Sequence, residues 1–250
     1  VEVDLVAHDG GSAKGDFVQT LDVTDVCTGW SEQRAVLNKA QKWVFEALVE
    51  IRERLPFAVL GLDSDNGGEF INNHLLNYCE EEGITFTRAR PYRKNDNCYV
   101  EQKNYSIVRR AVGYGRFTGE EAVKMLNELY DLVRLRSNFF LPSMKLIEKW
   151  REGSRVRKRY DTPKTPYQRV LDSKDVSPSA KARLTRQYKK LDLARIERRI
   201  QMITRRLERL IRRTQATRQE GRERVEEPNR PSSKAARHAG FQSAAKQSDS

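Results

Sequence analysis

The sequence predicts an α/β fold in which a mixed β-sheet lies between helices. Two observations carry this prediction. Three β-type segments come first, within residues 1–36, and helices then alternate with short strands up to residue 88. Strands followed by such an alternation are typical of a mixed sheet with helices on both faces.

The first three strands are expected at residues 1–8, 16–26 and about 30–36. The first is rich in β-branched and apolar residues, as strands are. A glycine-rich segment, residues 9–12, follows it and provides the backbone freedom that a hairpin turn requires.

The later elements follow from hydrophobic periodicity and turn signals. Apolar residues recur at helical spacing in three segments, and short apolar runs predict buried strands between them. Asn66-Gly67-Gly68 is a turn signal, and Gly83 is typical of a helix end. The expected order is helix 36–53, strand 57–62, helix 69–82, strand 84–88, a helix that opens near Glu101 and a helix at about 118–136.

Three carboxylates occupy positions that favour metal chemistry. Asp4 lies inside the first apolar strand, where a carboxylate is costly unless it is paired or binds a metal. Asp65 follows the apolar run at 57–62, at the strand end where open α/β sheets place ligands. Glu101 opens a helix, plausibly capped by Asn97 or Asp96. Two hard divalent cations held by oxygen ligands can stabilise both oxygens of an in-line displacement at phosphorus.

Spacing alone would be weak evidence for such a site. The chain has 35 acidic residues, so some trio at any chosen spacing is expected by chance. Each of the three residues also lies at a structural position that suits a metal ligand. This context favours a metal site over a chance spacing.

The residues around this trio resemble a known family. Asp65-Asn66-Gly67-Gly68-Glu69-Phe70 resembles the second-aspartate motif of retroviral-integrase-like transposases. Residues 90–97 and 100–104 resemble the glutamate region of the insertion-sequence members, and residues 21–30 are similar to their second and third strands. The resemblance covers about residues 1–140 and implies a ribonuclease H-like fold.

The resemblance also implies a function. Asp4, Asp65 and Glu101 would be the catalytic triad of a DDE transposase from a bacterial insertion sequence, holding two Mg²⁺ or Mn²⁺ ions. The implied reactions are DNA 3′-end cleavage and strand transfer, with neither a covalent enzyme intermediate nor ATP. The sequence contains no G-x-x-x-x-G-K-[ST] phosphate loop, which agrees. Asp63 departs from the pattern, since many members carry histidine there.

Charge is divided unevenly along the chain. Residues 1–140 carry 17 Lys/Arg against 22 Asp/Glu, and residues 141–250 carry 30 against 13. A basic half of this kind neutralises phosphates, so DNA is the expected partner. Arg93, Lys94 and Lys103 flank Glu101 and are predicted phosphate contacts, with plain surface charge as the even alternative.

The C-terminal half divides by composition. Residues 145–151 and 155–160 interleave basic and aromatic side chains. The resemblance extends to this stretch and implies contact with element-end DNA, so Arg157, Lys158 and Arg159 are predicted DNA-binding residues. The predicted organisation is a catalytic core at 1–138, a small basic module at 139–176, a basic amphipathic helix at 177–215 and a disordered tail at 216–250.

The helix within residues 181–213 has open alternatives. It carries 13 Lys/Arg against 3 acids, with apolar residues in a 3-4-3-4-3 repeat. The repeat is shorter than a firm coiled coil requires. Docking on its own chain is therefore as well supported as dimerisation or lying along DNA.

Composition sets further expectations. Cys27, Cys79 and Cys98 have no metal-ligand spacing and are expected to be reduced, structural thiols. The three histidines form no cluster, which argues against a zinc site. With neither a signal peptide nor a membrane-spanning apolar run, the sequence predicts a cytoplasmic, DNA-associated protein.

Two other classes of function stay open at this point. One is a ribonuclease H-type nuclease that only hydrolyses. The other is a non-catalytic DNA-binding fragment or relic of a transposase. The chain starts three residues before Asp4, so the helix-turn-helix region common in related transposases is expected to be missing. Transposases of this type usually act as homo-oligomers on paired DNA ends.

Overall fold

The computed structural model describes residues 1–90 and 96–226, with side chains up to residue 216. The chain forms two compact units, Val1–Glu208 and Arg209–Ser250. The first unit contains the sheet and all the predicted site residues that the structure describes. The described part of the second unit is the C-terminal portion of helix α8 (Leu193–Glu226). The four predicted domains remain a prediction.

Five strands form one mixed sheet: β1 (Glu2–Ala7), β2 (Gln19–Thr24), β3 (Ser31–Val36), β4 (Gly61–Ser64) and β5 (Thr85–Arg88). Their order in the sheet is β3-β2-β1-β4-β5. The three strands that come first in the chain pair antiparallel, and β1, β4 and β5 run parallel. This confirms the predicted α/β class with a mixed sheet.

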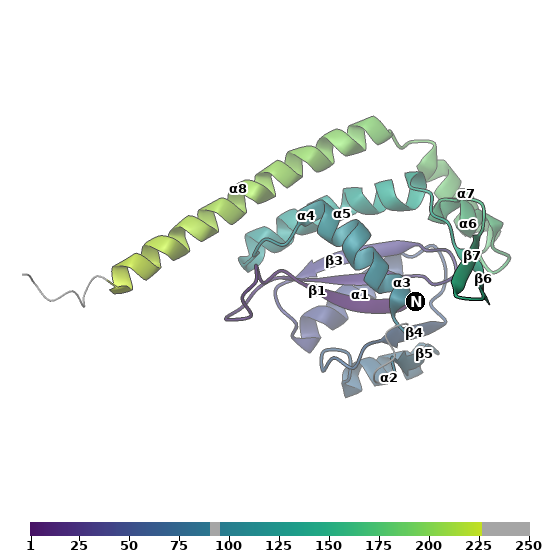
Figure 1. The fold of residues 1–250 in the computed structure, drawn as a ribbon, viewed down its shortest axis with the longest axis horizontal. Helices are drawn as coiled ribbons and strands as arrows, with labels where there is room; N and C mark the ends of the chain where they lie inside the picture. The colour runs from purple at the N-terminus through teal and green to yellow at the C-terminus, as the bar shows by residue number, and fades with distance from the viewer. Residues whose placement is uncertain (91–95, 227–250) are drawn as a thin grey trace, which may run out of the picture. The chain divides into compact units, whose positions relative to one another are not determined.

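Helices flank the sheet (Figure 1): α1 (Gln41–Arg54), α2 (Asn73–Glu81), α3 (Cys98–Lys103), the π-helical η1 (Asn104–Arg109), α4 (Arg110–Val112) and α5 (Gly119–Phe140). Helix α1 packs on β2 and β3, whereas α3 packs on β1 and β2. The main core contains Val3, Leu21 and Val23 of the sheet together with Val44 and Ile51 of α1. Burial of such side chains stabilises each by about 1.5–3 kcal/mol.

Two of the element boundaries that differ from the prediction affect the site. The strand expected at 57–62 is Gly61–Ser64, because pairing begins at Gly61 with β5 and at Asp63 with β1. Asp65 therefore follows the strand directly. The helix expected from residue 69 begins at Asn73, because the side chain of Asn72 accepts a hydrogen bond from the Leu75 amide at 2.9 Å and caps the helix there.

The edge strand β3 is sealed by two asparagines of α5. Asn138 donates to the Ser31 carbonyl at 2.8 Å and accepts from the Ser31 amide at 3.0 Å. Asn127 makes the same pair of bonds to Ala35, at 3.1 and 2.7 Å. Edge strands offer unpaired backbone groups to other chains. Side-chain amides occupy those groups here, so β3 is closed to strand addition at both positions.

We expect Asn138→Ala to destabilise the protein by about 2–4 kcal/mol. The substitution leaves a buried amide and a buried carbonyl of Ser31 without partners, each costing about 1–3 kcal/mol. Urea unfolding measures the difference. Asn127→Ala is the matched control, with a smaller loss expected, because Asn127 is only half-buried and water can replace its bonds. Equal losses in the two variants would contradict this account.

The chain continues into a hairpin and three helices: β6 (Leu146–Glu152), β7 (Arg155–Tyr160), α6 (Pro166–Asp172), α7 (Pro178–Tyr188) and α8. The expectation of one helix over 181–213 is wrong. The chain breaks between α7 and α8 because Asp192 begins a new helix, accepting a hydrogen bond from the Arg195 amide at 3.1 Å.

Within the first unit, α8 docks on its own chain. Ile196, Ile200, Ile203 and Leu207 are all buried. Glu128 of α5 lies 3.8 Å from Arg199 and 3.6 Å from Arg206. Of the alternatives for this segment, docking on the same chain is therefore the one that its first half adopts.

The predicted disordered tail is only partly covered by the structure. Helix α8 extends to Glu226, ten residues beyond the point at which the disordered tail is predicted to begin. Residues 227–250 lie outside the described residues. Over the part of the chain that is described, none of the helices combines the length and apolar character needed to span a bilayer.

Candidate active site

Asp4 lies on the central strand β1 and is held by two hydrogen bonds. Its Oδ2 accepts from the Asn104 side-chain amide at 2.6 Å, and its Oδ1 accepts from the Leu5 backbone amide at 2.8 Å. Asn104 is the first residue of η1. π-helical segments are frequent at functional sites, so the contact of this residue with Asp4 agrees with a functional role for Asp4. The pair links the sheet to the helix that carries Glu101.

Asp65 follows β4 and is fixed by a tight turn. Its Oδ1 accepts from the Gly67 amide at 2.9 Å, and Asn66 donates to the Ala89 carbonyl at 2.9 Å. A Cβ on Gly67 would lie 2.9 Å from Asp65 Oδ1 and 2.7 Å from the Glu69 carboxyl carbon. A larger residue there would displace the carboxylates of Asp65 and Glu69, so glycine lets the turn hold Asp65 as it lies.

Glu101 is exposed in the first turn of α3, and the start of that helix is held by a carboxylate from β1. Glu2 Oε2 accepts from the amides of Tyr99 and Val100 at 2.8 and 2.9 Å. Capping by Asn97 is wrong, because its side chain makes no capping hydrogen bond. Glu2 takes that place, so β1 positions the helix of Glu101 as well as carrying Asp4.

Capping by Asp96 is also not what the structure shows. Both carboxylate oxygens of Asp96 accept hydrogen bonds from Arg90, at 2.8 Å from Nε and from Nη2, and the Arg90 amide donates as well at 2.9 Å. The two residues join the ends of the segment 91–95, which lies outside the described residues.

The three carboxylates converge electrostatically on Asp4. Burial raises the pKa of Asp4 to about 6, and the negative charges of Asp65 and Glu101 contribute to this rise. Val3 lies opposite Ser64 in the parallel β1–β4 ladder, and Asp4 and Asp65 directly follow these two residues. Asn104, three residues after Glu101, donates a hydrogen bond to Asp4. The three elements that carry the predicted trio are therefore neighbours, and the trio itself stays a prediction.

The three carboxylates suit a hard divalent cation, although they are not already grouped as a complete metal site. All three residues offer carboxylate oxygens, which such ions prefer. The repulsion acting on Asp4 is what a bound cation would relieve. Throughout residues 1–90 and 96–226, no three His, Cys, Asp or Glu side chains are already grouped as a metal site.

A fourth carboxylate, Asp22, was missed by the sequence analysis. It lies directly opposite Asp4 in the β1–β2 ladder and is fully buried. Its Oδ1 accepts from Gln33 at 3.1 Å, while its Oδ2 is buried without a hydrogen-bond partner. Burial raises the pKa of Asp22 to about 7, and the charge of Asp4 contributes to the rise. The sequence did contain a signal for Asp22, because it is a polar residue at the centre of the otherwise apolar run 21–23.

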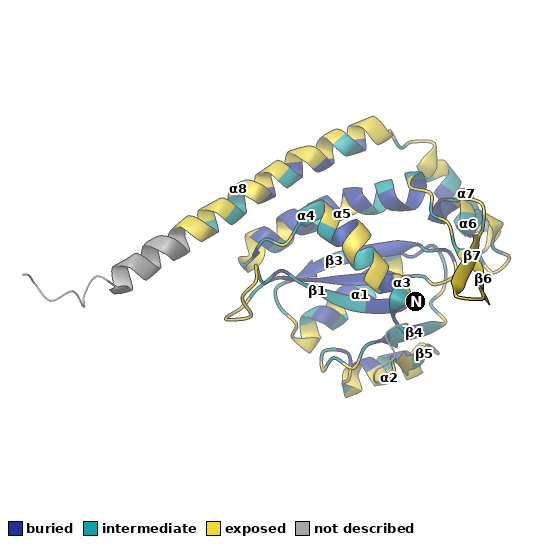
Figure 2. Ribbon diagram, viewed as in Figure 1, coloured by how far each residue is buried: buried dark blue, intermediate teal, exposed yellow. Residues whose placement is uncertain are grey.

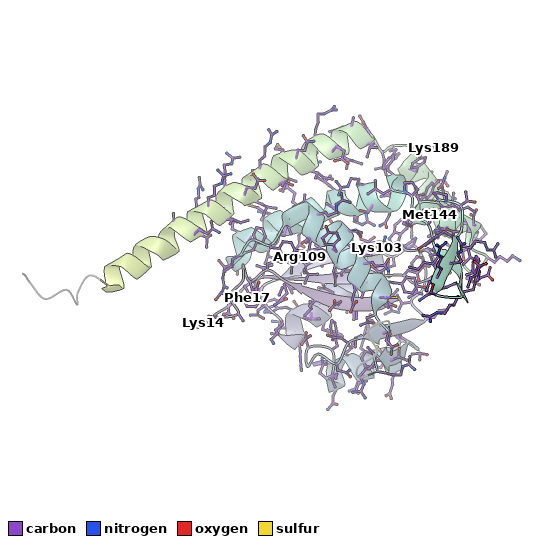
Figure 3. All side chains as sticks on the ribbon, in the orientation of Figure 1. Lys14, Phe17, Lys103, Arg109, Met144 and Lys189 are labelled. Atoms are coloured by element: carbon purple, nitrogen blue, oxygen red, sulfur yellow. The ribbon has the colours of Figure 1, made fainter. Side chains whose placement is uncertain are left out.

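Lys103 is half-buried, and its charge acts on that of Asp22. Figure 3 labels it on the helix that crosses the sheet. Burial lowers the pKa of Lys103, and the negative charge of Asp22 opposes that effect. The role of Lys103 as a phosphate contact stays a prediction, and its partial burial is the feature that the sequence did not indicate.

The other predicted contacts are placed as follows. Arg93 and Lys94 lie outside the described residues. Arg157 and Arg159 are exposed and pair with glutamates of the same hairpin, at 3.1 and 3.2 Å. Lys158 is exposed. For all five residues, contact with DNA stays a prediction.

Asp63 has a structural partner in the sheet. It lies in β4, and the Thr87 hydroxyl of the adjacent strand donates to its Oδ1 at 2.7 Å. The extra carboxylate is therefore tied to β5. Cys27, Cys79 and Cys98 are all free thiols; Cys79 is buried, whereas Cys27 is exposed.

No protein-family model matches the chain. The chain is 50% identical over 169 residues to the uncharacterized protein y4rM of Sinorhizobium fredii, a match that covers 68% of this chain and 48% of y4rM. The chain thus spans about half the length of this curated relative.

Two solved structures resemble the chain distantly. One is the catalytic core domain of BIV integrase, with a TM-score of 0.45, 19% identity and coverage of 68% of this chain and 92% of that one. The other is the simian T-cell lymphotropic virus intasome in complex with the PP2A regulatory subunit B56 gamma. Its TM-score is 0.43, with 11% identity and coverage of 65% and 66%.

Proposed function

We propose that this chain carries the catalytic core of an integrase-like DNA transposase with a ribonuclease H-like fold. Asp4, Asp65 and Glu101 would act together in metal-dependent cleavage of DNA 3′ ends and in strand transfer. The observation that carries the proposal is geometric: Val3 and Ser64, which directly precede Asp4 and Asp65, lie opposite each other in the sheet, and Asn104 bonds the helical segment after Glu101 to Asp4. The sequence motifs around Asp65 and Glu101 support it independently.

Two Mg²⁺ or Mn²⁺ ions held by these carboxylates would supply Lewis-acid stabilisation of the attacking and leaving oxygens. The contribution of the chain itself is to position the three carboxylates. Asn104 orients Asp4, the Gly67 amide orients Asp65, and Glu2 anchors the first turn of α3. Ligands held in this way before substrate binds need little reorganisation during the reaction.

DNA is the proposed partner, with the basic half of the chain bringing it to an acidic site. Residues 141–250 carry 30 Lys/Arg against 13 Asp/Glu. Neutralising phosphates in this way gives affinity without reading sequence. Assembly of several copies on paired DNA ends belongs to the same proposal.

A strand-transfer assay tests the proposal. The whole chain is incubated with short duplexes that carry free 3′ hydroxyls and with a supercoiled target, in Mg²⁺ or Mn²⁺ and in EDTA. We expect joined products that require the metal. Hydrolysis without joining would favour a ribonuclease H-type nuclease, and DNA binding without either reaction would favour a non-catalytic relic.

We expect Asn104→Ala to slow joining by about 10–100-fold at saturating DNA. Residues that orient metal-ligating carboxylates have effects of this size when they are removed. Single-turnover rates measure the change, and DNA affinity should stay the same. Gln102→Ala, an exposed neighbour on α3, is the control. A variant of Asn104 that joins at the wild-type rate would refute the orienting role.

A further inference from the structure

The β6–β7 hairpin is an exposed ribbon with no core of its own. Every residue of both strands is exposed, as Figure 2 shows in yellow. Only its base is anchored: the Lys145 amide and the Arg169 guanidinium donate to Asp161, each at 2.6 Å. A two-stranded ribbon is marginally stable in water by itself. Its exposed apolar side chains, among them Trp150, are typical of a binding element.

One face of the ribbon balances its charges internally. Residues that lie directly opposite each other in the ladder share a face. Glu148 lies opposite Arg159, with which it pairs at 3.2 Å. Glu152 lies opposite Arg155 and pairs with Arg157 at 3.1 Å. We call this surface, with Trp150 at its centre, the paired face.

The other face carries cations without acids. Lys149 lies directly opposite Lys158, and the next position on this face sets Arg151 opposite Val156. These four residues form the open face, and none of them is acidic. Like charges directly opposite each other destabilise a ladder. The arrangement is therefore unfavourable in water and becomes favourable when a polyanion covers it.

We propose that the open face is a docking surface for the phosphate backbone of duplex DNA. The choice of DNA rests on the proposed function. A two-stranded ribbon also fits the major groove of B-form DNA, whereas the major groove of A-form RNA is too deep and narrow for it. Lys149 and Arg151 thus join Lys158 as contacts, and Arg157 and Arg159 belong to the opposite surface.

Two triple variants of the same hairpin test this assignment. Lys149→Gln, Arg151→Gln and Lys158→Gln remove the open-face cations. Arg155→Gln, Arg157→Gln and Arg159→Gln remove the same charge from the paired face and are the matched control. DNA affinity is measured by fluorescence anisotropy across a salt series, with circular dichroism to confirm folding. A double variant, Lys149→Arg with Lys158→Arg, keeps both positive charges and is a further control.

We expect the open-face triple to lose affinity and to reduce the slope of log affinity against log salt by about 2–3. The control should reduce the slope by less than about one, and the arginine variant should bind like the wild type. Equal slope losses in the two triples would overturn the assignment of the face. Duplex RNA bound as tightly as DNA would overturn the choice of DNA.

These outcomes separate the inference from the proposed function. If the wild type joins DNA but the open-face triple binds it normally, the docking surface alone fails. If the wild type binds no DNA at any salt concentration, the proposed function and the docking surface both fail. A slope loss confined to the open-face triple supports the docking surface even where no joining occurs.

Discussion

Asp65→Asn or Glu101→Gln should each reduce strand transfer by more than about 10³-fold while the protein remains folded and bound to DNA. Removing a charged ligand forfeits several kcal/mol of charge stabilisation at the reacting phosphate, and each 1.36 kcal/mol is a factor of ten in rate. Both residues lie at the ends of elements, outside the hydrophobic core, so folding should not depend on them.

The matched control for this prediction is Asp63→Asn. It makes the same chemical change two residues before Asp65, at a carboxylate that is bonded to Thr87 in the adjacent strand. Joining and cleavage are measured on the same preparation, and thermal unfolding confirms the fold. Joining retained in Asp65→Asn, or lost equally in Asp63→Asn, would remove Asp65 from the site.

Asp22→Asn should stabilise the protein at pH 8, with a gain that disappears toward pH 4. Burial raises the pKa of Asp22 to about 7 in the folded state, from 3.8. Below pH 3.8 the carboxyl is protonated in both the folded and the unfolded states, and its contribution to stability is fully present. As the pH rises through 7 that contribution is lost, by at most about 4 kcal/mol. Asparagine carries no such dependence.

Urea unfolding of the wild type and Asp22→Asn at several pH values measures this difference. Asp161→Asn provides a control of opposite sign, because the guanidinium of Arg169 holds the pKa of Asp161 down to about 2. That variant should be less stable than the wild type at neutral pH and should approach it in acid. A gain for Asp22→Asn that is independent of pH would show that burial of its charge is not the cause.

The stability change predicted for Asp22→Asn also bears on function. A buried carboxylate opposite Asp4 destabilises the folded state at neutral pH, and such costs are common where a site needs charge. Asp22 lies opposite Asp4 in the ladder, and its charge and that of Lys103 act on each other. The effect of Asp22 on joining can be measured in the same variant.

The sequence was informative wherever the signal is local. The apolar run before Asp4 and the turn after Asp65 predicted a strand and a strand end, and the structure contains both. Capping was harder to predict, because Glu2 reaches the amides of α3 from nearly a hundred residues away. Nothing near Asn97 in the sequence indicates that its place is taken by a carboxylate of the first strand.

What the sequence determined by itself was the mixed α/β class and the element beside which each of the three carboxylates lies, since strand alternation, turn glycines and helix starts depend on neighbouring residues. Only the tertiary structure decided the rest. The antiparallel register set Asp22 opposite Asp4, and packing of α3 on the sheet left Lys103 half-buried. The register of the hairpin put Lys149 opposite Lys158 and gave Arg159 a partner. A shift of one residue in either ladder would move each side chain to the opposite face. Amino-acid composition does not indicate which register forms.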